Sequence, residues 1–264
     1  MQDIPSVVGV RPLRMVRAGA GAVLFAALAV VWIVCPAGRL REKVERTGLA
    51  ALLRAFGVRV AQRGAKVPGA LYVANHVSWI EIPALALATG AGFVAKAEVA
   101  DWPLVGALAR GKGCVFVRRE ARLGAGAQAQ ELGERLEGRG IVLFPEGTTG
   151  PGDALLPFRS SLFAAVHDLG TAPTQPVTVR FTAHDGSALS GAALRRVAWL
   201  GEDALLPHAL ALAWHGGVTI ELWFEPPVAG TGRKAIAAAC QAAIAQRLGP
   251  GGVPAQAATQ KRAA

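Results

Sequence analysis

The pattern of apolar and polar positions changes once along the chain, near residue 57. Residues 18–38 read "AGAGAVLFAALAVVWIVCPAG" and carry no charge, whereas residues 40–56 mix charged and apolar positions. The apolar residues of the second stretch can share one side of a helix; they are Leu40, Val44, Leu49, Leu52, Leu53 and Phe56. Beyond residue 57, short β-rich runs alternate with helical stretches, which is typical of α/β proteins.

The alternation predicts individual elements. Strands are expected at 58–62, 70–74, 91–95, 114–117, 140–144, 175–181 and 218–225. Helices are expected at 79–89, 103–110, 127–138, 159–169, 203–213 and 233–247. No internal repeat interrupts this order, so the body of the chain is expected to form one domain.

The uncharged stretch 18–38 has 21 residues, and roughly 20 apolar residues span a bilayer core. The stretch reaches that length only by counting Gly and Pro, so a crossing helix and a half-inserted helix both stay open. Basic residues flank both ends and leave the orientation undecided. A cleavable signal peptide is the alternative, but no small-x-small cleavage site follows. The second helix either completes a membrane hairpin or packs on the core.

We therefore expect an α/β fold: a mixed β-sheet flanked by helices, with an N-terminal membrane-anchoring helical hairpin. The expected divisions are residues 1–56 for the anchoring helices, 57–248 for the α/β domain and 249–264 for a disordered tail.

Composition narrows the class of partner. The chain has 264 residues, of which 52% are hydrophobic, and 28 basic against 18 acidic residues give a net charge of +10. Such a surface suits an acidic membrane or nucleic acid. With one tyrosine and no zinc-finger spacing, nucleic acid is not expected as a partner. Three distant cysteines form neither a disulfide framework nor a metal-ligand spacing, which indicates a reducing compartment.

Polar clusters follow three of the predicted strands. "NH" follows strand 70–74, "RRE" follows 114–117 and "PEGTTG" follows 140–144. Open α/β sheets place their sites at such strand ends, so the three clusters are candidates for one site.

His76 and Glu81 form the first candidate pair. An imidazole accepts a proton near neutral pH, and a carboxylate on its other nitrogen fixes the tautomer. No Gly-x-Ser-x-Gly elbow supplies a nucleophile. The alternative is structural, because "SWIE" fits a capping box in which Glu81 pairs with the Ser78 backbone.

The other two clusters suit anions. The arginine cluster could bind a phosphate, or it could be an ordinary solvated strand end; its members are Arg118, Arg119 and Arg122. Glycine-rich "PEGTTG" could present backbone N–H groups and hydroxyls to an oxyanion, or form an ordinary turn. A plain turn gives no reason for the carboxylate of Glu146 directly after an apolar strand.

Taken in order, "NHVSWIE", "GCVFVRRE", "FPEGTTG" with "PFRSS", and "QPVTV" resemble the four blocks of the glycerolipid acyltransferase superfamily. The nearest branch is the bacterial 1-acyl-sn-glycerol-3-phosphate (lysophosphatidic acid) acyltransferases. The resemblance extends from about residue 50 to residue 230 and includes "FVAKAEV" and "WLGEDALLPH".

The resemblance implies a membrane-bound acyltransferase of phospholipid biosynthesis, on the cytoplasmic face of a bacterial inner membrane. It would move an acyl group from acyl-CoA or acyl carrier protein to the free hydroxyl of a lysophospholipid, with no cofactor and no metal. His76 and Glu81 would be catalytic, with His76 as general base. The remaining blocks would bind substrate through Arg118, Arg119, Arg122, Glu146, Gly147, Thr148 and Thr149, and Pro176 matches the fourth block.

One residue departs from the family pattern. The first block normally ends in aspartate, and Glu81 stands there. Glutamate keeps the charge and adds a methylene, which puts its contact with the histidine in doubt. Lysophosphatidic acid is the expected acceptor, with a lyso-ornithine lipid as the alternative. Thioester hydrolysis and a non-catalytic membrane-binding relative are further alternatives.

Overall fold

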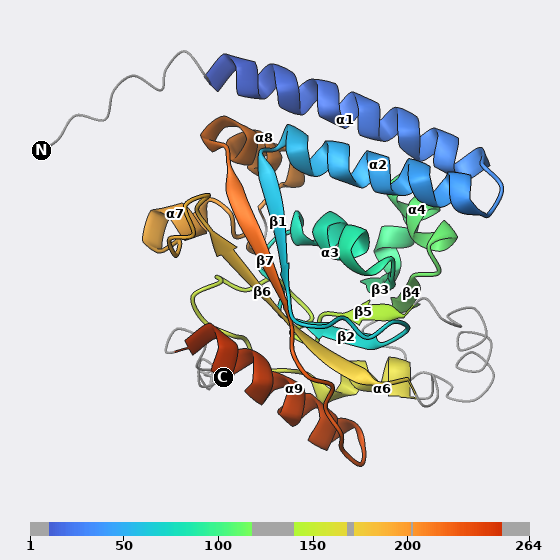
Figure 1. Cartoon of the computed structure of the whole chain (residues 1–264), viewed down its shortest axis with the longest axis vertical. Coiled ribbons are helices and arrows are strands. Elements are labelled where there is room, and N and C mark those ends of the chain that lie inside the picture. Colours follow the sequence, from blue (N-terminus) through green and yellow to red (C-terminus); the bar gives the residue numbers. More distant parts are fainter. Residues whose placement is uncertain (1–10, 118–139, 168–171, 202, 250–264) are drawn as a thin grey trace, which may run out of the picture.

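The computed structural model describes residues 11–117, 140–167, 172–201 and 203–249. Helices cover both faces of a central mixed sheet (Figure 1). The strands found in the described residues lie in the order β1-β7-β6-β2-β5-β3-β4. Their bounds are β1 Val58–Arg63, β2 Leu71–Ala74, β3 Gly92–Lys96, β4 Val115–Val117, β5 Ile141–Leu143, β6 Thr174–Thr182 and β7 Val218–Phe224. Neighbours run parallel except β6 and β7, which are antiparallel.

Strand β2 lies between β5 and β6 and is buried along its whole length. Successive side chains of a strand point to opposite faces, and here each face meets a separate apolar cluster. Tyr72 and Ala74 pack in one cluster, whereas Leu71 and Val73 pack in the other. This burial on both sides explains the continuous apolar run in the sequence.

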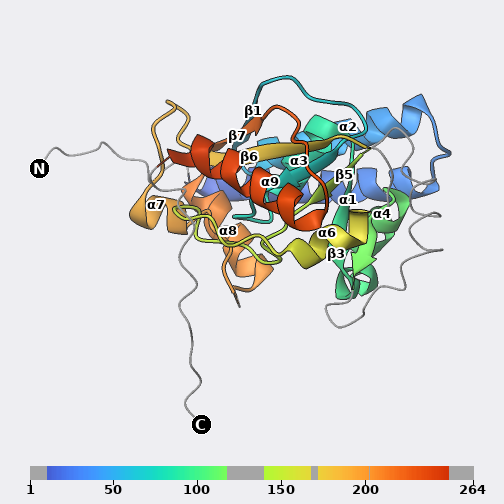
Figure 2. The ribbon, with the colours of Figure 1, turned by 90° about the horizontal axis from the view of Figure 1, so that it is seen from below.

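The helices divide between the two faces. On one face lie α6 Ser160–His167 and α9 Arg233–Leu248, seen from below in Figure 2. The other face carries α1 Arg11–Val34, α2 Arg39–Ala55, α3 Glu81–Thr89 and α8 Leu205–His215. The 3-10 helix η2 Ala97–Asp101, α4 Val105–Gly111 and α7 Gly191–Arg195 complete the described helices.

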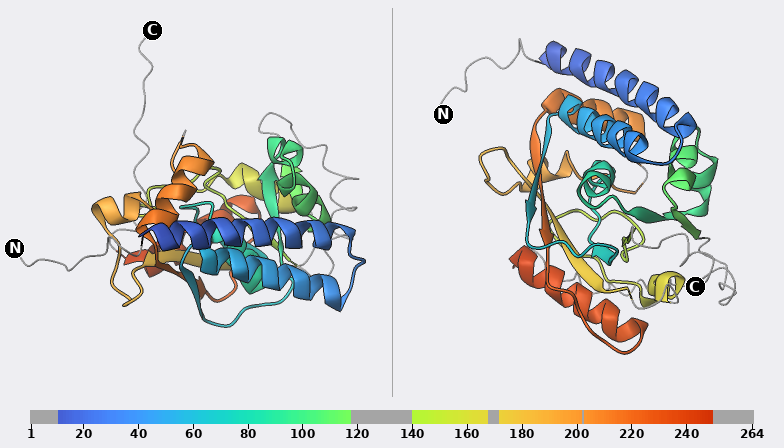
Figure 3. Two further views of the ribbon diagram at one scale, coloured as in Figure 1. Left: turned by 90° about the horizontal axis from the view of Figure 1, so that it is seen from above. Right: turned by 45° about the vertical axis from the view of Figure 1, so that its right-hand side comes forward.

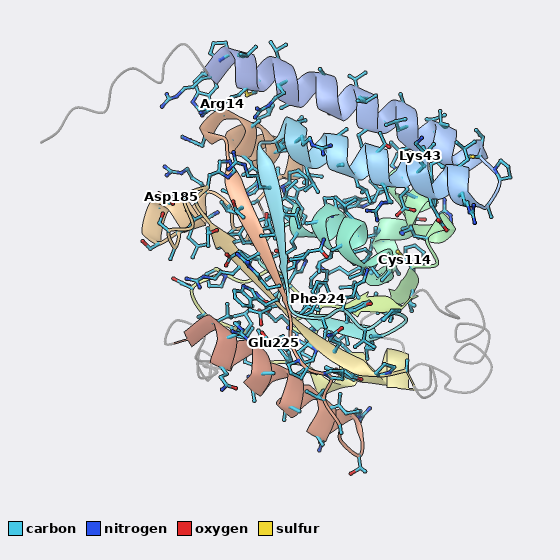
Figure 4. The ribbon with its side chains drawn as sticks, viewed as in Figure 1. Arg14, Lys43, Cys114, Asp185, Phe224 and Glu225 are labelled. Carbon is cyan, nitrogen blue, oxygen red and sulfur yellow. The ribbon has the colours of Figure 1, made fainter. Side chains whose placement is uncertain are left out.

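A paired carboxylate fastens α9 to the sheet. Glu225, directly after β7, accepts hydrogen bonds from Nε and Nη2 of Arg247 at 2.8 and 2.9 Å. Figure 4 shows Glu225 between the strands and α9. The guanidinium of Arg247 also lies 4.5 Å from the ring centroid of Trp223, so the end of α9 is fixed by charge and by stacking.

The predicted strands are confirmed to within one residue at each end, and the predicted helices that fall on described residues begin within two residues of the predicted positions. The first helix is longer than expected, because it begins at Arg11 rather than at residue 18. The predicted helix 127–138 and the tail after Gly249 lie outside the described residues.

Helices α1 and α2 pack as a hairpin along the body of the domain (Figure 3). Among the described helices, α1 alone is long and apolar enough to cross a membrane. It is nevertheless attached at both ends. Arg14 near its start donates from Nη1 to the carbonyl of His215 at 3.1 Å. Near its end Trp32 is buried, with the Arg41 guanidinium 3.8 Å from the ring centroid.

Gly21 sets how closely the two hairpin helices approach. A Cβ at this position would lie 2.0 Å from Cβ of Ala55, whereas a Cβ at Gly19 would meet nothing within 4 Å. Alanine at 21 must therefore push α2 away from α1, although alanine favours a helix over glycine by about 1 kcal/mol.

We expect Gly21→Ala to lower the unfolding midpoint in detergent, with an overpacking cost of about 1–3 kcal/mol. Gly19→Ala is the matched control and should leave the midpoint unchanged or raise it. Thermal unfolding followed by circular dichroism checks both. Equal midpoints for the two variants would contradict the close helix contact.

Candidate active site

The candidate site begins where β2 ends. Asn75 lies directly after the strand and is buried. Its side-chain oxygen accepts from the backbone N of Val179 at 2.8 Å, and its side-chain nitrogen donates to the Val179 carbonyl at 2.9 Å. The amide thereby replaces one rung of the β2–β6 ladder, so the chain leaves the sheet at a fixed point and presents His76 at its edge.

His76 and Glu81 are in direct contact. Nδ1 of His76 lies 2.5 Å from Oε1 of Glu81, whose side chain is completely buried. The Glu81 carboxylate also accepts the backbone N–H groups of Val77 at 2.9 Å and Ser78 at 3.0 Å. Because α3 begins at Glu81, the longer carboxylate folds back over the turn and reaches the imidazole ring.

The structure therefore supports in part both interpretations of "SWIE", the capping box and the histidine–carboxylate pair. Glu81 accepts the Ser78 N–H as a capping box requires, and it also orients the histidine. The other half of the box is missing, because the buried Ser78 hydroxyl has no hydrogen-bond partner among the residues that the structure describes. The structural role and the catalytic geometry use the same carboxylate.

The imidazole ring is held on its face as well as at its edge. The ring centroids of His76 and Phe144 are 4.0 Å apart, with 17° between the planes. Nε2 makes no hydrogen bond to any described residue, and the side chain keeps 15% of its exposure. With Nδ1–H donated to a carboxylate, Nε2 carries the lone pair that can accept a proton from outside.

The loop after β5 closes on the backbone of the histidine. Oε1 of Glu146 accepts the His76 N–H at 2.7 Å, and Oε2 accepts the Leu156 N–H at 3.1 Å. The N–H of Gly150 donates to the His76 carbonyl at 2.7 Å. Both backbone groups of His76 are thus used by the "PEGTTG" loop.

Burial is the main cause that raises the pKa of Glu146 to about 8. The two backbone N–H donors lower the pKa, and the nearby Glu81 charge raises it further. Glu146 is only 3% exposed, so at neutral pH its carboxyl is largely protonated.

A third loop joins the site through Trp199. The Trp199 N–H donates to the Val77 carbonyl at 3.0 Å, and the Thr149 hydroxyl donates to the Trp199 carbonyl. Trp79, three residues after the histidine, donates from Nε1 to Nδ1 of His208 at 3.0 Å, and Nε2 of His208 bonds the Ala198 carbonyl. The stretch "WLGEDALLPH" therefore supports the loop that carries His76.

The predicted site residues are brought together where the structure describes them. His76, Glu81 and Glu146 are joined by hydrogen bonds, and Thr149 is joined to them through Trp199 and Val77. Gly147 and Thr148 lie in the same loop, where Gly147 takes a positive φ of 70°. Arg118, Arg119 and Arg122 fall outside the described residues. Pro176 pairs with Val73 in the β2–β6 ladder.

The sequence assigned no role to Phe144, to the Trp79–His208 pair or to Arg159. Arg159 is exposed, and a Cβ on Gly147 would lie 3.7 Å from its guanidinium carbon. Its side chain makes no hydrogen bond or ion pair with the described residues. The sequence feature that could have indicated Arg159 is "PFR", which follows shortly after "FPEGTTG". In the described residues no group of His, Cys, Asp or Glu could hold a metal ion.

Comparison with known proteins identifies the family. A family profile described as Acyltransferase matches residues 57–180. A lyso-ornithine lipid O-acyltransferase from Brucella abortus is 38% identical over 70% of this chain and 73% of its own length. One from Pseudomonas aeruginosa is 37% identical over 78% of each chain. A 1-acyl-sn-glycerol-3-phosphate acyltransferase from Neisseria meningitidis is 36% identical over 52% of this chain and 54% of its own.

The fold is also known. The crystal structure of the 1-acyl-sn-glycerophosphate acyltransferase from Thermotoga maritima superposes with a TM-score of 0.60 at 19% identity, covering 90% of this chain and 94% of that one. The chain belongs to the glycerolipid acyltransferase superfamily and is an enzyme that transfers acyl groups to lipids. The expected fold class and family are both confirmed.

The raised pKa of Glu146 predicts a pH dependence of stability. Between its usual value of 4.5 and about 8 the folded chain binds more protons at this carboxyl than the unfolded chain. The free energy of unfolding should therefore fall as pH rises through that range, by an amount on the order of 4 kcal/mol.

Glu146→Gln should remove this dependence and give a flatter plot of unfolding midpoint against pH from 5 to 8. Glu221→Gln, on the partly exposed side of β7, is the control and should keep the wild-type slope. The same slope in Glu146→Gln as in wild type would show that Glu146 is ionised.

Proposed function

We propose that this enzyme transfers a fatty acyl group from the thioester of acyl-CoA or acyl carrier protein to the free hydroxyl of a lysolipid, with His76 as general base. One observation carries the proposal. The buried Glu81 carboxylate contacts Nδ1 of His76 at 2.5 Å while Nε2 has no partner among the described residues. A histidine oriented in this way is ready to take a proton from a bound hydroxyl.

The reaction balances without an enzyme-bound acyl group. Nε2 accepts the hydroxyl proton as the lysolipid oxygen attacks the thioester carbonyl, and Glu81 stabilises the imidazolium that forms. Collapse of the tetrahedral intermediate breaks the carbon–sulfur bond. The imidazolium then gives its proton to the leaving thiolate. Ser78, the hydroxyl nearest to His76 in sequence, is fully buried, which favours direct transfer over a serine intermediate.

The comparisons favour a lyso-ornithine lipid as the acceptor. Relatives with that name match 68–78% of this chain, whereas the two named 1-acyl-sn-glycerol-3-phosphate acyltransferases match 52%. This reverses the order expected from the motifs alone. Lysophosphatidic acid stays as the second candidate because those two relatives are 35–36% identical.

The same proposal covers location. We infer that residues 1–56 anchor the α/β domain to a membrane, because α1 exposes apolar side chains along much of its length. These include Leu13, Val16, Val23, Leu24, Val30, Val31 and Val34. Since α1 is attached to the domain at both ends, it lies along one leaflet rather than across the bilayer. Both acyl donors are intracellular, so the domain would face the cytoplasm.

Purified protein in liposomes should acylate lyso-ornithine lipid faster than lysophosphatidic acid. His76→Ala should lower kcat by a factor on the order of 10²–10⁴, because the proton acceptor is lost. Glu81→Asp should also be slower, since the shorter side chain withdraws the carboxylate from Nδ1. Labelled acyl-CoA and acyl carrier protein, assayed by thin-layer chromatography, check each donor and acceptor.

Glu98→Asp, in η2, is the control for the shortened side chain and should keep wild-type turnover. Product from His76→Ala at the wild-type rate would exclude the general-base role. Faster turnover in Glu81→Asp would mean that glutamate at this position is a handicap.

Arg159 lies next to Gly147 of the "PEGTTG" loop, and each candidate acceptor carries an anionic group, a phosphate in one and the ornithine carboxylate in the other. Arg159→Gln should raise the acceptor KM about tenfold with kcat nearly unchanged, since a hydrogen bond to a charged group is lost. Arg233→Gln, at the exposed start of α9, is the matched control. An unchanged KM for both acceptors would remove Arg159 from head-group binding.

A further inference from the structure

We propose that α8 is a second membrane-contact element, which docks on an acidic lipid surface beside α1 and brings the His76 loop to that surface. The evidence for the membrane contact is the set of exposed apolar residues on α8 and the charges beside them. Its consequence for catalysis rests on the proposed acyl transfer.

Helix α8 carries an apolar stripe that nothing in the described chain covers. Leu206, Leu210 and Trp214 are 69%, 46% and 39% exposed. They are spaced four residues apart and so share one face of the helix. The opposite face is buried through His208 and Leu212. A helix with one face in the core and a leucine–tryptophan stripe outside is typical of an interfacial element.

The stripe ends beside the first turn of α1. The Arg11 guanidinium lies 5.5 Å from the ring centroid of Trp214, and Arg14 bonds the carbonyl of His215. Figure 3 shows α8 beside the first half of α1, and Figure 4 labels Arg14 where the two helices meet. At the other end of α1, Trp102 and Val105 are 43% and 42% exposed. One lipid surface can therefore contact α1 and the elements beside both of its ends.

The charges at the end of α8 select the kind of surface. Arg11, Arg14 and Arg196 gather around His215. Asp203, just before the start of α8, is paired with Arg195 at 3.0 Å. Tryptophan and arginine at the edge of an apolar stripe suit the head-group region of an anionic bilayer.

The buried face of α8 reaches the catalytic loop. Nδ1 of His208 accepts the indole N–H of Trp79, and the Trp79 ring packs edge-on against Phe56 at 5.4 Å. Trp79 is thus held by α8 on one side and by the end of α2 on the other. A membrane that holds both helices also fixes Trp79, three residues from His76, which places the base beside lipids that enter from the leaflet.

Matched charge insertions test the docking. Leu206→Glu/Leu210→Glu puts two carboxylates on the stripe, and Ala238→Glu/Ala242→Glu puts two on the exposed face of α9, on the other side of the sheet. Flotation with vesicles of phosphatidylglycerol and phosphatidylcholine should show partition about tenfold weaker for the α8 variant. Circular dichroism confirms folding of both. Equal partition of the two variants would overturn the proposal.

A probe on the stripe gives a direct second measurement. Leu206→Cys labelled with an environment-sensitive fluorophore, with Cys35 and Cys114 replaced by serine, should shift to the blue when the vesicles are added. The same label at Ala238→Cys should not shift. A blue shift that needs high protein concentration and no vesicles would show that a second copy covers the stripe, and would overturn the proposal.

These measurements need no turnover and stand even if the proposed reaction fails. If the reaction holds, the α8 variant should lose activity on acceptor in vesicles and keep it on a short-chain acceptor below its micelle concentration. Equal losses on both would contradict the link from α8 to the His76 loop.

Discussion

The backbone N–H groups of His76, Val77 and Ser78 all donate to buried carboxyl groups, and the geometry of the site depends on this arrangement. Glu146 receives the first, and Glu81 receives the other two together with Nδ1 of the imidazole. Successive N–H groups that point at acceptors hold a turn in one conformation. Each carboxyl group is costly to bury, and most of the donors that offset the cost come from the turn that must be positioned. The turn and its acceptors therefore stabilise one another.

This arrangement explains why glutamate can replace the aspartate of the family pattern. Glu81 is the first residue of α3, so its side chain starts beneath the turn rather than beside it. The additional methylene is used to reach back across Val77 and Ser78 to the ring. The sequence left the contact between Glu81 and His76 in doubt because it gives only the number of residues between them. The distance from the carboxylate to the imidazole depends on where the helix begins.

Most of the fold was predictable from sequence because the central strands are buried on both sides and flanked by clear turn signals. The motifs also predicted His76, Glu81 and Glu146. Three features were not predictable. Stacking of Phe144 on His76 depends on the neighbouring positions of β2 and β5. The Trp79–His208 bond joins residues 129 apart. The double role of Glu81 can be predicted only if the first residue of the helix is known without error. Such contacts arise from tertiary packing, which local patterns do not encode.

The bond between Asn75 and Val179 spans 104 residues, and this separation affects the order in which the site forms. Strand β2 lies between two neighbours that follow it by about 70 and 100 residues. During synthesis Asn75 therefore lacks its Val179 partner until β6 has emerged, and closing so long a loop carries an entropic cost before its contacts repay it. The proposed anchoring helices α1 and α2 come first. If α1 and α2 bind lipid and His76 is the base, as proposed, the chain has its membrane anchor long before its active site forms, so it can be localised before it becomes active.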